Sequence, residues 1–298
     1  MAANEGFVTT DDGVRLFVQQ MGSGGRTVVI LNSTYMYEEF KYLAEDRAVI
    51  FYDLRNRGRS DSVNDGSKLR GGVHNDVDDL ETIRRHFNLD SMDVIGHSYL
   101  GMVVGLYAMK HPSRANRVVQ IGASAPDRRK QYPAHLTGAD ATMTEVNAKL
   151  AELQKEATST EPQEFGRKMW ALMRLLYVTD PADADKILWD VAHLPNESFT
   201  RLMANYSQYL LPSFQGMKLT DEDFARVKTP VLVVHGTRDR QCPYGGARDW
   251  AVRWPNARLV TIENAAHLAW IESPNKVFGS VKTFLDGAWP DAAELVTA

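Results

Sequence analysis

The sequence has few of the features that mark secreted, membrane-spanning or nucleic-acid-binding proteins. Its 298 residues include a single cysteine, Cys242, which excludes an internal disulfide framework and fits a reducing compartment. No apolar run approaches about 20 residues, the length of a membrane span, and the first twenty residues lack the apolar stretch of a signal peptide. The 34 basic and 38 acidic side chains nearly balance and form no long run of one sign, so neither nucleic acid nor a membrane surface is an expected partner. We therefore expect a cytoplasmic protein.

Signatures of bound cofactors are missing as well. The chain has no Gly-rich phosphate loop, no dinucleotide fingerprint and no clustered metal ligands, so we expect neither a cofactor nor a metal ion. Cys242 has no dedicated histidine and no strand-to-helix turn beside it, which favours an inert thiol over a nucleophile. The sequence does not indicate an oligomeric state.

Short apolar runs alternate with helical patterns in the first and last parts of the chain. Thr27–Leu31 is rich in β-branched residues throughout, which is typical of a strand that is buried on both faces of a sheet. Similar strands are expected at 48–52, 92–95, 118–121, 230–234 and 258–262, a hairpin at 6–20, and helices at 73–87, up to about 110 and at 274–285. This alternation predicts an α/β fold with a doubly wound, mostly parallel sheet.

The middle of the chain has a different pattern. From about residue 126 to 224 we find no convincing strand, and apolar residues recur at helical spacing, as in Met143, Val146 and Leu150. Prolines separate these stretches, as expected at helix boundaries. We therefore expect residues 1–125 and 225–298 to form the α/β core and residues 126–224 to form an all-helical insertion between core strands.

One stretch, Ser91–Gly105, joins a strand, a tight turn and a helix. Ser98 lies at the tip of the turn, and the helix begins directly after it. A turn of this kind strains the backbone of its central residue, lifts the hydroxyl clear of the sheet and points the positive end of the helix at it. Ser98 is therefore a candidate nucleophile, and the alternative is that it only caps the helix.

A serine hydroxyl needs a base that accepts its proton, and the base needs a partner that fixes its orientation. His267 follows the strand at 258–262, and Asp239 follows the strand at 230–234. Both residues therefore fall on loops that leave the carboxyl ends of strands, where ligands bind in open α/β sheets. Asp127, which follows the strand at 118–121, is the alternative acid.

The chain order of serine, acid and histidine resembles that of the α/β-hydrolase family. The stretch around Ser98 resembles the nucleophile elbow G-x-S-x-G of this family, except that Leu100 stands in the second small position and Gly101 follows it. The resemblance implies that Ser98 is the nucleophile, His267 the base and Asp239 the acid of a catalytic triad.

Two further segments carry the same resemblance. The helical insertion looks like the cap of the cap-bearing branch that includes proline iminopeptidases. Asp53–Ser60 resembles the turn D-x-R-G-x-G-x-S found in many members, with Asn56 in a glycine position. The three arginines of this turn suit structural ion pairs better than phosphate binding, because acidic residues lie close to them in the sequence.

The resemblance also implies an oxyanion hole made of two backbone N–H groups. One belongs to Tyr99, the residue after the nucleophile. By position the second belongs to Thr34, with Ser33 as the alternative. Many relatives carry His-Gly-Gly here, whereas this chain has Asn32-Ser33-Thr34, a departure that weakens the iminopeptidase interpretation.

Side chains near these positions are candidates for binding a small-molecule substrate. They are Asn32, Ser33 and Tyr35 in the loop after the strand at 27–31, and Trp170 and Tyr206 in the helical insertion. The main hypothesis is a serine hydrolase that cleaves a carboxylic ester of a partly apolar substrate through an acyl-enzyme. The alternatives are cleavage of an N-terminal proline amide or of a C–C bond by the same triad, and a non-catalytic ligand-binding protein on the same fold.

Overall fold

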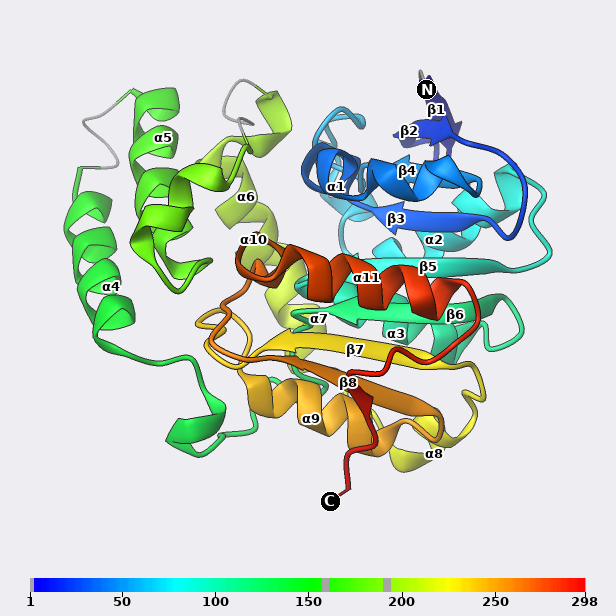
Figure 1. Ribbon diagram of the computed structural model, residues 1–298. Helices are drawn as coiled ribbons and strands as arrows, with labels where there is room; N and C mark the ends of the chain where they lie inside the picture. The colour runs from blue at the N-terminus through cyan, green and yellow to red at the C-terminus, as the bar shows by residue number, and fades with distance from the viewer. Residues whose placement is uncertain (1–2, 157–160, 190–193, 298) are drawn as a thin grey trace.

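The apolar runs of the sequence form the centre of a nine-stranded sheet that is covered by helices on both faces (Figure 1). The computed structural model describes residues 3–156, 161–189 and 194–297. The strand order is β1-β2-β4-β3-β5-β6-β7-β8-β9, and neighbouring strands are parallel from β4 through β8. β1, β2 and β9 pair in the antiparallel sense at the two edges. The predicted α/β class with a doubly wound, mostly parallel sheet is confirmed.

The strands are β1 (Asn4–Thr9), β2 (Arg15–Met21), β3 (Val28–Leu31), β4 (Val49–Tyr52), β5 (Met92–His97), β6 (Ala115–Ile121), β7 (Val231–Gly236), β8 (Ala257–Ile262) and β9 (Ala293–Glu294). The helices are α1 (Ser33–Phe40), α2 (Val73–His86), α3 (Tyr99–Lys110), α4 (Ala141–Gln154), α5 (Pro162–Met173), α6 (Phe199–Asn205), α7 (Leu211–Gln215), α8 (Asp221–Ala225), α9 (Tyr244–Arg253), α10 (Ala269–Glu272) and α11 (Pro274–Leu285). No helix in the described part of the chain is both long and apolar enough to span a membrane.

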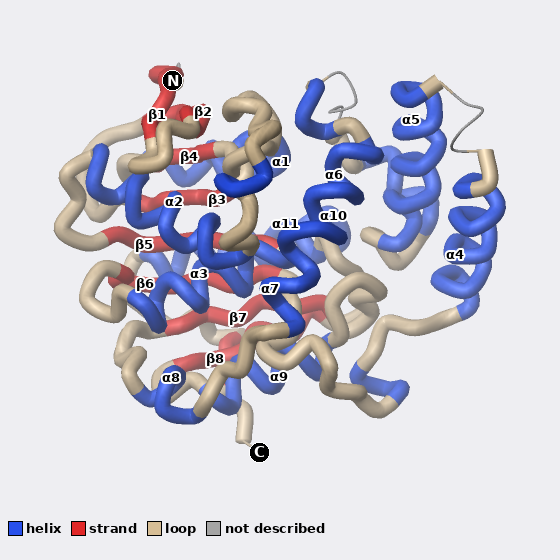
Figure 2. The backbone as a smooth tube through the Cα atoms, turned by 180° about the vertical axis from the view of Figure 1, so that it is seen from behind, coloured by secondary structure: helices blue, strands red, loops and turns tan. Residues whose placement is uncertain are grey.

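The central strands are apolar on both sides because each side packs against helices. All four residues of β3 are buried, and successive side chains enter different clusters. Val29 belongs to a cluster that includes residues of α2, α3 and α9, whereas Ile30 belongs to one that includes residues of α1 and α11. Figure 1 views the sheet from the α11 side, and Figure 2 views it from the side of α2 and α3.

Between β6 and β7 the described residues form helices and connecting loops without a strand. Helices α4, α5 and α6 lie beyond the carboxyl ends of the parallel strands (Figure 1). The division into a core and a 126–224 cap stays a prediction, because the end of that range packs with the core: Phe214 of α7 and Phe224 of α8 belong to the cluster that contains α2 and α3.

The turn after β4 holds the helical segment against the sheet. Glu197 accepts hydrogen bonds from Arg57 Nε and Nη2 at 2.9 and 3.0 Å, from the Gly58 amide at 2.6 Å and from the Tyr35 hydroxyl at 2.5 Å. The Glu197 side chain is fully buried by these contacts. The neighbouring Asn196 donates to the Ser60 carbonyl at 2.7 Å. We call Glu197 together with Tyr35, Arg57 and Gly58, which donate these four hydrogen bonds, the latch.

The arginines of this turn form ion pairs, as the sequence predicts. Arg57 pairs with Glu197, Arg59 Nε lies 3.3 Å from Asp53, and Arg55 Nη2 lies 2.6 Å from Asp79. Asn56 and Gly58 have φ values of 59° and 49°, which fits the expected tight turn.

Replacement of Glu197 tests the latch. Glu197→Gln leaves the Arg57 guanidinium without its counter-charge, and we expect the free energy of unfolding to fall by about 3 kcal/mol. The measurement is urea unfolding followed by tryptophan fluorescence. The control is Glu222→Gln, which removes an exposed pair with Arg226 and should change stability by less than about 0.5 kcal/mol. Equal stability of the two variants would contradict the structural role of the latch.

Candidate active site

Ser98 occupies a strained turn between β5 and α3. Its φ and ψ are 58° and −126°, and its side chain makes no capping hydrogen bond to α3, which argues against the helix-cap interpretation. A Cβ at Gly96 would lie 2.1 Å from the Leu100 carbonyl oxygen, and one at Gly101 would lie 2.6 Å from Ala123 Cβ. The turn therefore needs small residues at 96 and 101, while Leu100 has room to line a cavity.

His267 and Asp239 meet at the carboxyl ends of β7 and β8. His267 Nδ1 donates to Asp239 Oδ2 at 2.8 Å, which leaves Nε2 free of the carboxylate. The other oxygen, Oδ1, accepts from the amides of Gln241 and Cys242 at 2.8 Å each. Although burial opposes ionisation, His267 and His235 hold the pKa of Asp239 well below its usual range. Asp239 is thus kept charged beside the imidazole.

Asp127, the alternative acid, forms no hydrogen bond with His267 in the described part of the chain. It bonds to Arg129 at the surface, with the Asp127 side chain 46% exposed. The structure therefore overturns the alternative and pairs Asp239 with His267.

Ser98 and His267 line the same cavity. The described residues contain no hydrogen bond between them, and such bonds often tighten only when substrate is present. The Ser98 side chain also contacts the thiol of the buried Cys242.

His267 is packed between two rings. Tyr177 stacks on it with ring centroids 5.2 Å apart and an interplanar angle of 23°. His97 lies 4.5 Å away on centroids, and its Nε2 donates to the His267 carbonyl at 3.1 Å. Burial and the proximity of His267 hold the pKa of His97 well below its usual range, so His97 is a neutral support.

The helical segment contacts the loops that carry the acid and the base. The Leu268 amide donates to the Tyr177 carbonyl at 3.0 Å, directly after His267. Arg240, directly after Asp239, donates to the Val178 carbonyl and pairs with Asp140, the N-cap residue of α4, at 2.7 Å. Residues 177–178, which we call the 177–178 strap, therefore contact both loops.

The predicted second oxyanion donor is wrong. Helix α1 begins at Ser33, directly after β3, and the Thr34 amide donates to Asp53 Oδ1 at 2.7 Å. Its N–H is therefore not available to a substrate. Ser33 is 1% exposed, bonds to Gln19 Oε1 and Arg59, and does not line the cavity. Without glycines after β3, the chain enters a helix at once, and a carboxylate at its N-terminus takes the free amide.

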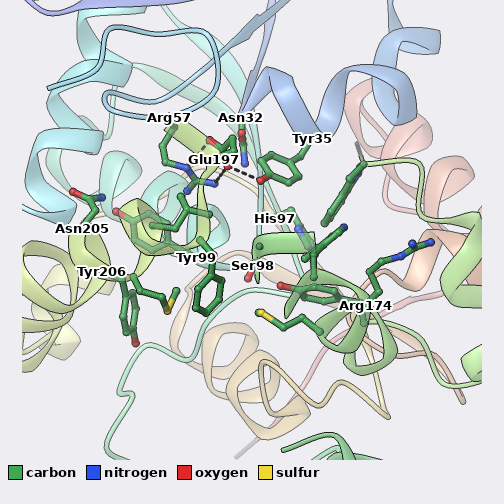
Figure 3. Close-up of a pocket in the computed structure, with 18 of the residues that line it drawn as sticks. Asn32, Tyr35, Arg57, His97, Ser98, Tyr99, Arg174, Glu197, Asn205 and Tyr206 are labelled. Atoms are coloured by element: carbon green, nitrogen blue, oxygen red, sulfur yellow. Dashed lines mark hydrogen bonds and ion pairs between the residues drawn. The ribbon is translucent and has the colours of Figure 1, made fainter. Parts of the chain in front are cut away.

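Other predicted positions do face the cavity, which has a volume of about 710 Å³. Asn32, Tyr35, Tyr99 and Tyr206 line it together with Ser98 (Figure 3). Trp170 is a further lining residue. The Tyr99 hydroxyl itself turns away to Asp76, whose pKa is raised to about 7 by burial. The Tyr99 amide belongs to the first residue of α3, where an N–H has no intrahelical partner.

One wall of the cavity is a series of aromatic rings. Tyr35 packs edge-on against Trp189 at 4.9 Å, Trp189 stacks on Trp170 at 5.8 Å, and Trp170 packs against Tyr177 at 5.5 Å between centroids. Tyr177 then stacks on His267, so the series runs from the latch to the base. Helical spacing in the sequence could not show which of these rings face a cavity.

The charged residues of the cavity are mostly arginines. Arg57, Arg128, Arg167 and Arg174 line it, and Glu197 is the one acid among the described lining residues. The Glu197 carboxylate is already occupied by the latch. Sequence reasoning missed Arg57 and Glu197 as lining residues, because 140 positions separate the two partners.

One group of side chains has metal-ligand chemistry. Donor atoms of Asp239, Cys242 and His267 lie within 4.8 Å of one another. Burial raises the pKa of Cys242 to about 12, so its thiol stays protonated, whereas a metal ligand must be a thiolate. This donor set fits a hydrogen-bonded acid and base better than a metal site.

Comparison with known proteins defines the class. The α/β-hydrolase fold family model matches residues 22–274, so the chain belongs to this family. A proline iminopeptidase from Heyndrickxia coagulans is 23% identical over 95% of this chain and 98% of the relative. A non-heme haloperoxidase from Rhodococcus erythropolis is 24% identical over 88% of this chain and 92% of the relative.

Solved structures agree on the fold. An esterase from Exiguobacterium antarcticum superposes with a TM-score of 0.71 at 18% identity, over 96% of this chain and 100% of the esterase. A meta-cleavage product hydrolase from Pseudomonas fluorescens has a TM-score of 0.69 at 17% identity, over 94% of this chain and 97% of that protein. These structures agree with the α/β-hydrolase fold that the family model gives.

The buried Asp239 carboxylate makes stability depend on pH. Its folded-state pKa is depressed, so its contribution is complete above the ordinary aspartate pKa and is lost as the pH falls toward the folded-state value. We expect Asp239→Asn to lower the free energy of unfolding by about 2 kcal/mol at pH 7 and by less below about pH 4. Urea unfolding across this pH range measures both effects.

Asp127→Asn is the matched control, because it makes the same change at the surface. It should alter stability by less than about 0.5 kcal/mol at any pH. An Asp239→Asn deficit that stays constant from pH 7 to pH 3 would contradict the assignment of a charged Asp239.

Proposed function

We propose that the protein is a serine hydrolase that cleaves a carboxylic ester of a small, partly apolar substrate. The observation that carries the proposal is the convergence of Ser98, in its strained turn, with His267, whose Nδ1 is held by Asp239, on one cavity. Family membership supports the hydrolase class.

The reaction follows from this arrangement. His267 Nε2 takes the Ser98 proton as Oγ attacks the ester carbonyl, and the positive end of α3 with the Tyr99 amide stabilises the oxyanion. His267 then gives its proton to the departing alkoxide, which leaves as an alcohol. Water, deprotonated by His267, attacks the acyl-enzyme, and the proton returns to Ser98 as the carboxylic acid is released. Asp239 stabilises the imidazolium in both steps.

The cavity favours an ester over an N-terminal amide. A substrate with a free N-terminal amine carries a positive charge and needs an unpaired carboxylate in its site. Glu197 accepts four hydrogen bonds in the latch, and the other charged side chains among the described lining residues are arginines. The aromatic wall suits an apolar acyl or alcohol group. Cleavage of a C–C bond next to a carbonyl would use the same residues and serves as an outcome of the substrate screen.

Removal of the nucleophile tests the mechanism. Ser98→Ala should lower kcat for p-nitrophenyl esters by about 10⁴-fold or more while the thermal unfolding temperature changes little. A fluorophosphonate probe should label the wild-type protein once, at Ser98, by peptide mass spectrometry. Full activity in Ser98→Ala would refute the mechanism, and a wild-type protein that neither reacts with the probe nor turns over substrates would favour a ligand-binding role.

Substrate preference is tested with chromogenic substrates that release p-nitrophenol or p-nitroaniline. We expect kcat/KM for p-nitrophenyl esters of graded chain length to exceed that for proline p-nitroanilide by at least about 10²-fold, because an ester is intrinsically more reactive than an anilide and no described lining residue offers a free carboxylate to the ammonium. A ketone-containing C–C hydrolase substrate forms the third arm of the screen. A preference for the proline amide would contradict the ester assignment and support the iminopeptidase alternative.

A further inference from the structure

An oxyanion hole needs a second donor besides the Tyr99 amide, and the predicted backbone donors do not supply it. The Thr34 N–H is bonded to Asp53, and Ser33 lies off the cavity. We propose that the side-chain amide of Asn32 is this donor, an inference that rests on the proposed function. Asn32 would then be a catalytic residue rather than a substrate-binding one.

The sheet register places Asn32 beside the nucleophile. β3 and β5 are neighbouring parallel strands, with Ile30 opposite Ile95. Two residues further on, Asn32 is level with His97 and one residue short of Ser98. Asn32 has a φ of 70°, so the chain leaves the strand at this residue, and its side chain lines the cavity that contains Ser98 (Figure 3).

The backbone of Asn32 is committed to the fold, but its side chain is not. Its N–H donates to the Tyr52 carbonyl at 2.8 Å, and its own carbonyl accepts from Tyr35 and Met36 at 3.0 Å. The side-chain Oδ1 is buried without a hydrogen-bond partner, and the amide makes no capping bond to α1. A half-buried carboxamide that no protein group holds is unusual, because buried polar groups are normally paired.

Because no protein group holds it, the carboxamide is free to act as a donor. The carboxamide NH₂ carries two N–H groups at the carboxyl edge of the sheet, where negative charge would develop on the substrate oxygen. It would contribute only when the tetrahedral intermediate forms, so its removal should slow the chemical step rather than weaken binding. The side chain would thus replace the backbone N–H that the family's glycine-containing loop is expected to provide.

Two substitutions separate this role from a structural one. Asn32→Gly keeps the left-handed backbone without strain and removes the amide, and Asn32→Asp keeps the shape without donors at neutral pH. For both we expect kcat with p-nitrophenyl butyrate to fall by about 10²-fold to 10³-fold, with KM changed by less than about threefold. Asn88→Gly, also at a positive φ of 53° but in the turn after α2, is the matched control and should keep full activity.

A transition-state analogue provides the second measurement. An alkyl trifluoromethyl ketone forms a tetrahedral adduct with the serine, and its inhibition constant should rise with the same fold-change as kcat falls. If kcat falls while the inhibition constant stays the same, or if KM carries the loss, the oxyanion role is refuted. Full activity in Asn32→Gly also refutes it but leaves the proposed function intact, provided that Ser98→Ala is inactive. Lack of Ser98 labelling in the wild type would instead remove the proposed function itself.

Discussion

The Asp53 carboxylate joins the parts of the molecule on which the site depends. It is fully buried at the end of β4 and accepts hydrogen bonds from the Thr34 amide, the Thr34 hydroxyl and the Arg59 amide. The two hydrogen bonds from Thr34 hold the start of α1 against the end of β3. The hydrogen bond from Arg59 holds the turn after β4, which contributes to the latch. Gly58 is required for this approach, because a Cβ there would lie 2.4 Å from Asp53 Oδ2.

This contact also determines what the chain can offer a reacting carbonyl. Asp53 accepts the hydrogen bond of the Thr34 amide, which allows α1 to begin shortly after β3. The Thr34 N–H is then no longer available as a donor to a substrate. The neighbouring Asn32 is left with a left-handed backbone and an unpaired side chain. A structural hydrogen bond and the composition of the proposed oxyanion hole are therefore two results of the same buried charge.

Much of the fold was predictable because it depends on local pattern. The apolar runs of the central strands and the 274–285 helix follow from periodicity alone, and the elbow follows from a serine between glycines at the end of a strand. The oxyanion prediction failed because it assumed the family's loop, whereas the start of α1 depends on a carboxylate from the next strand. The partner of Arg57 could not be found either, since Glu197 lies in a different segment and no local spacing connects them.

The relatives show how little the scaffold alone decides. Proteins named as a proline iminopeptidase, a haloperoxidase and an esterase share it with this chain at similar, low identity. The described part of this chain's cavity holds an occupied glutamate, several arginines and a continuous aromatic wall. Function in such a family is a property of the site and not of the sheet.

The 177–178 strap has a consequence for how the helical segment can evolve. Because Tyr177 covers the imidazole and Arg240 bonds to Val178 beside Asp239, this segment supports the hydrogen-bonded pair of Asp239 and His267 and also lines the cavity. A recombination that exchanged the segment from α4 through Val178 for that of another family member would also exchange the Tyr177 ring against His267. The lining of the cavity and the packing around the imidazole would then change in a single event, and neither could be selected independently of the other.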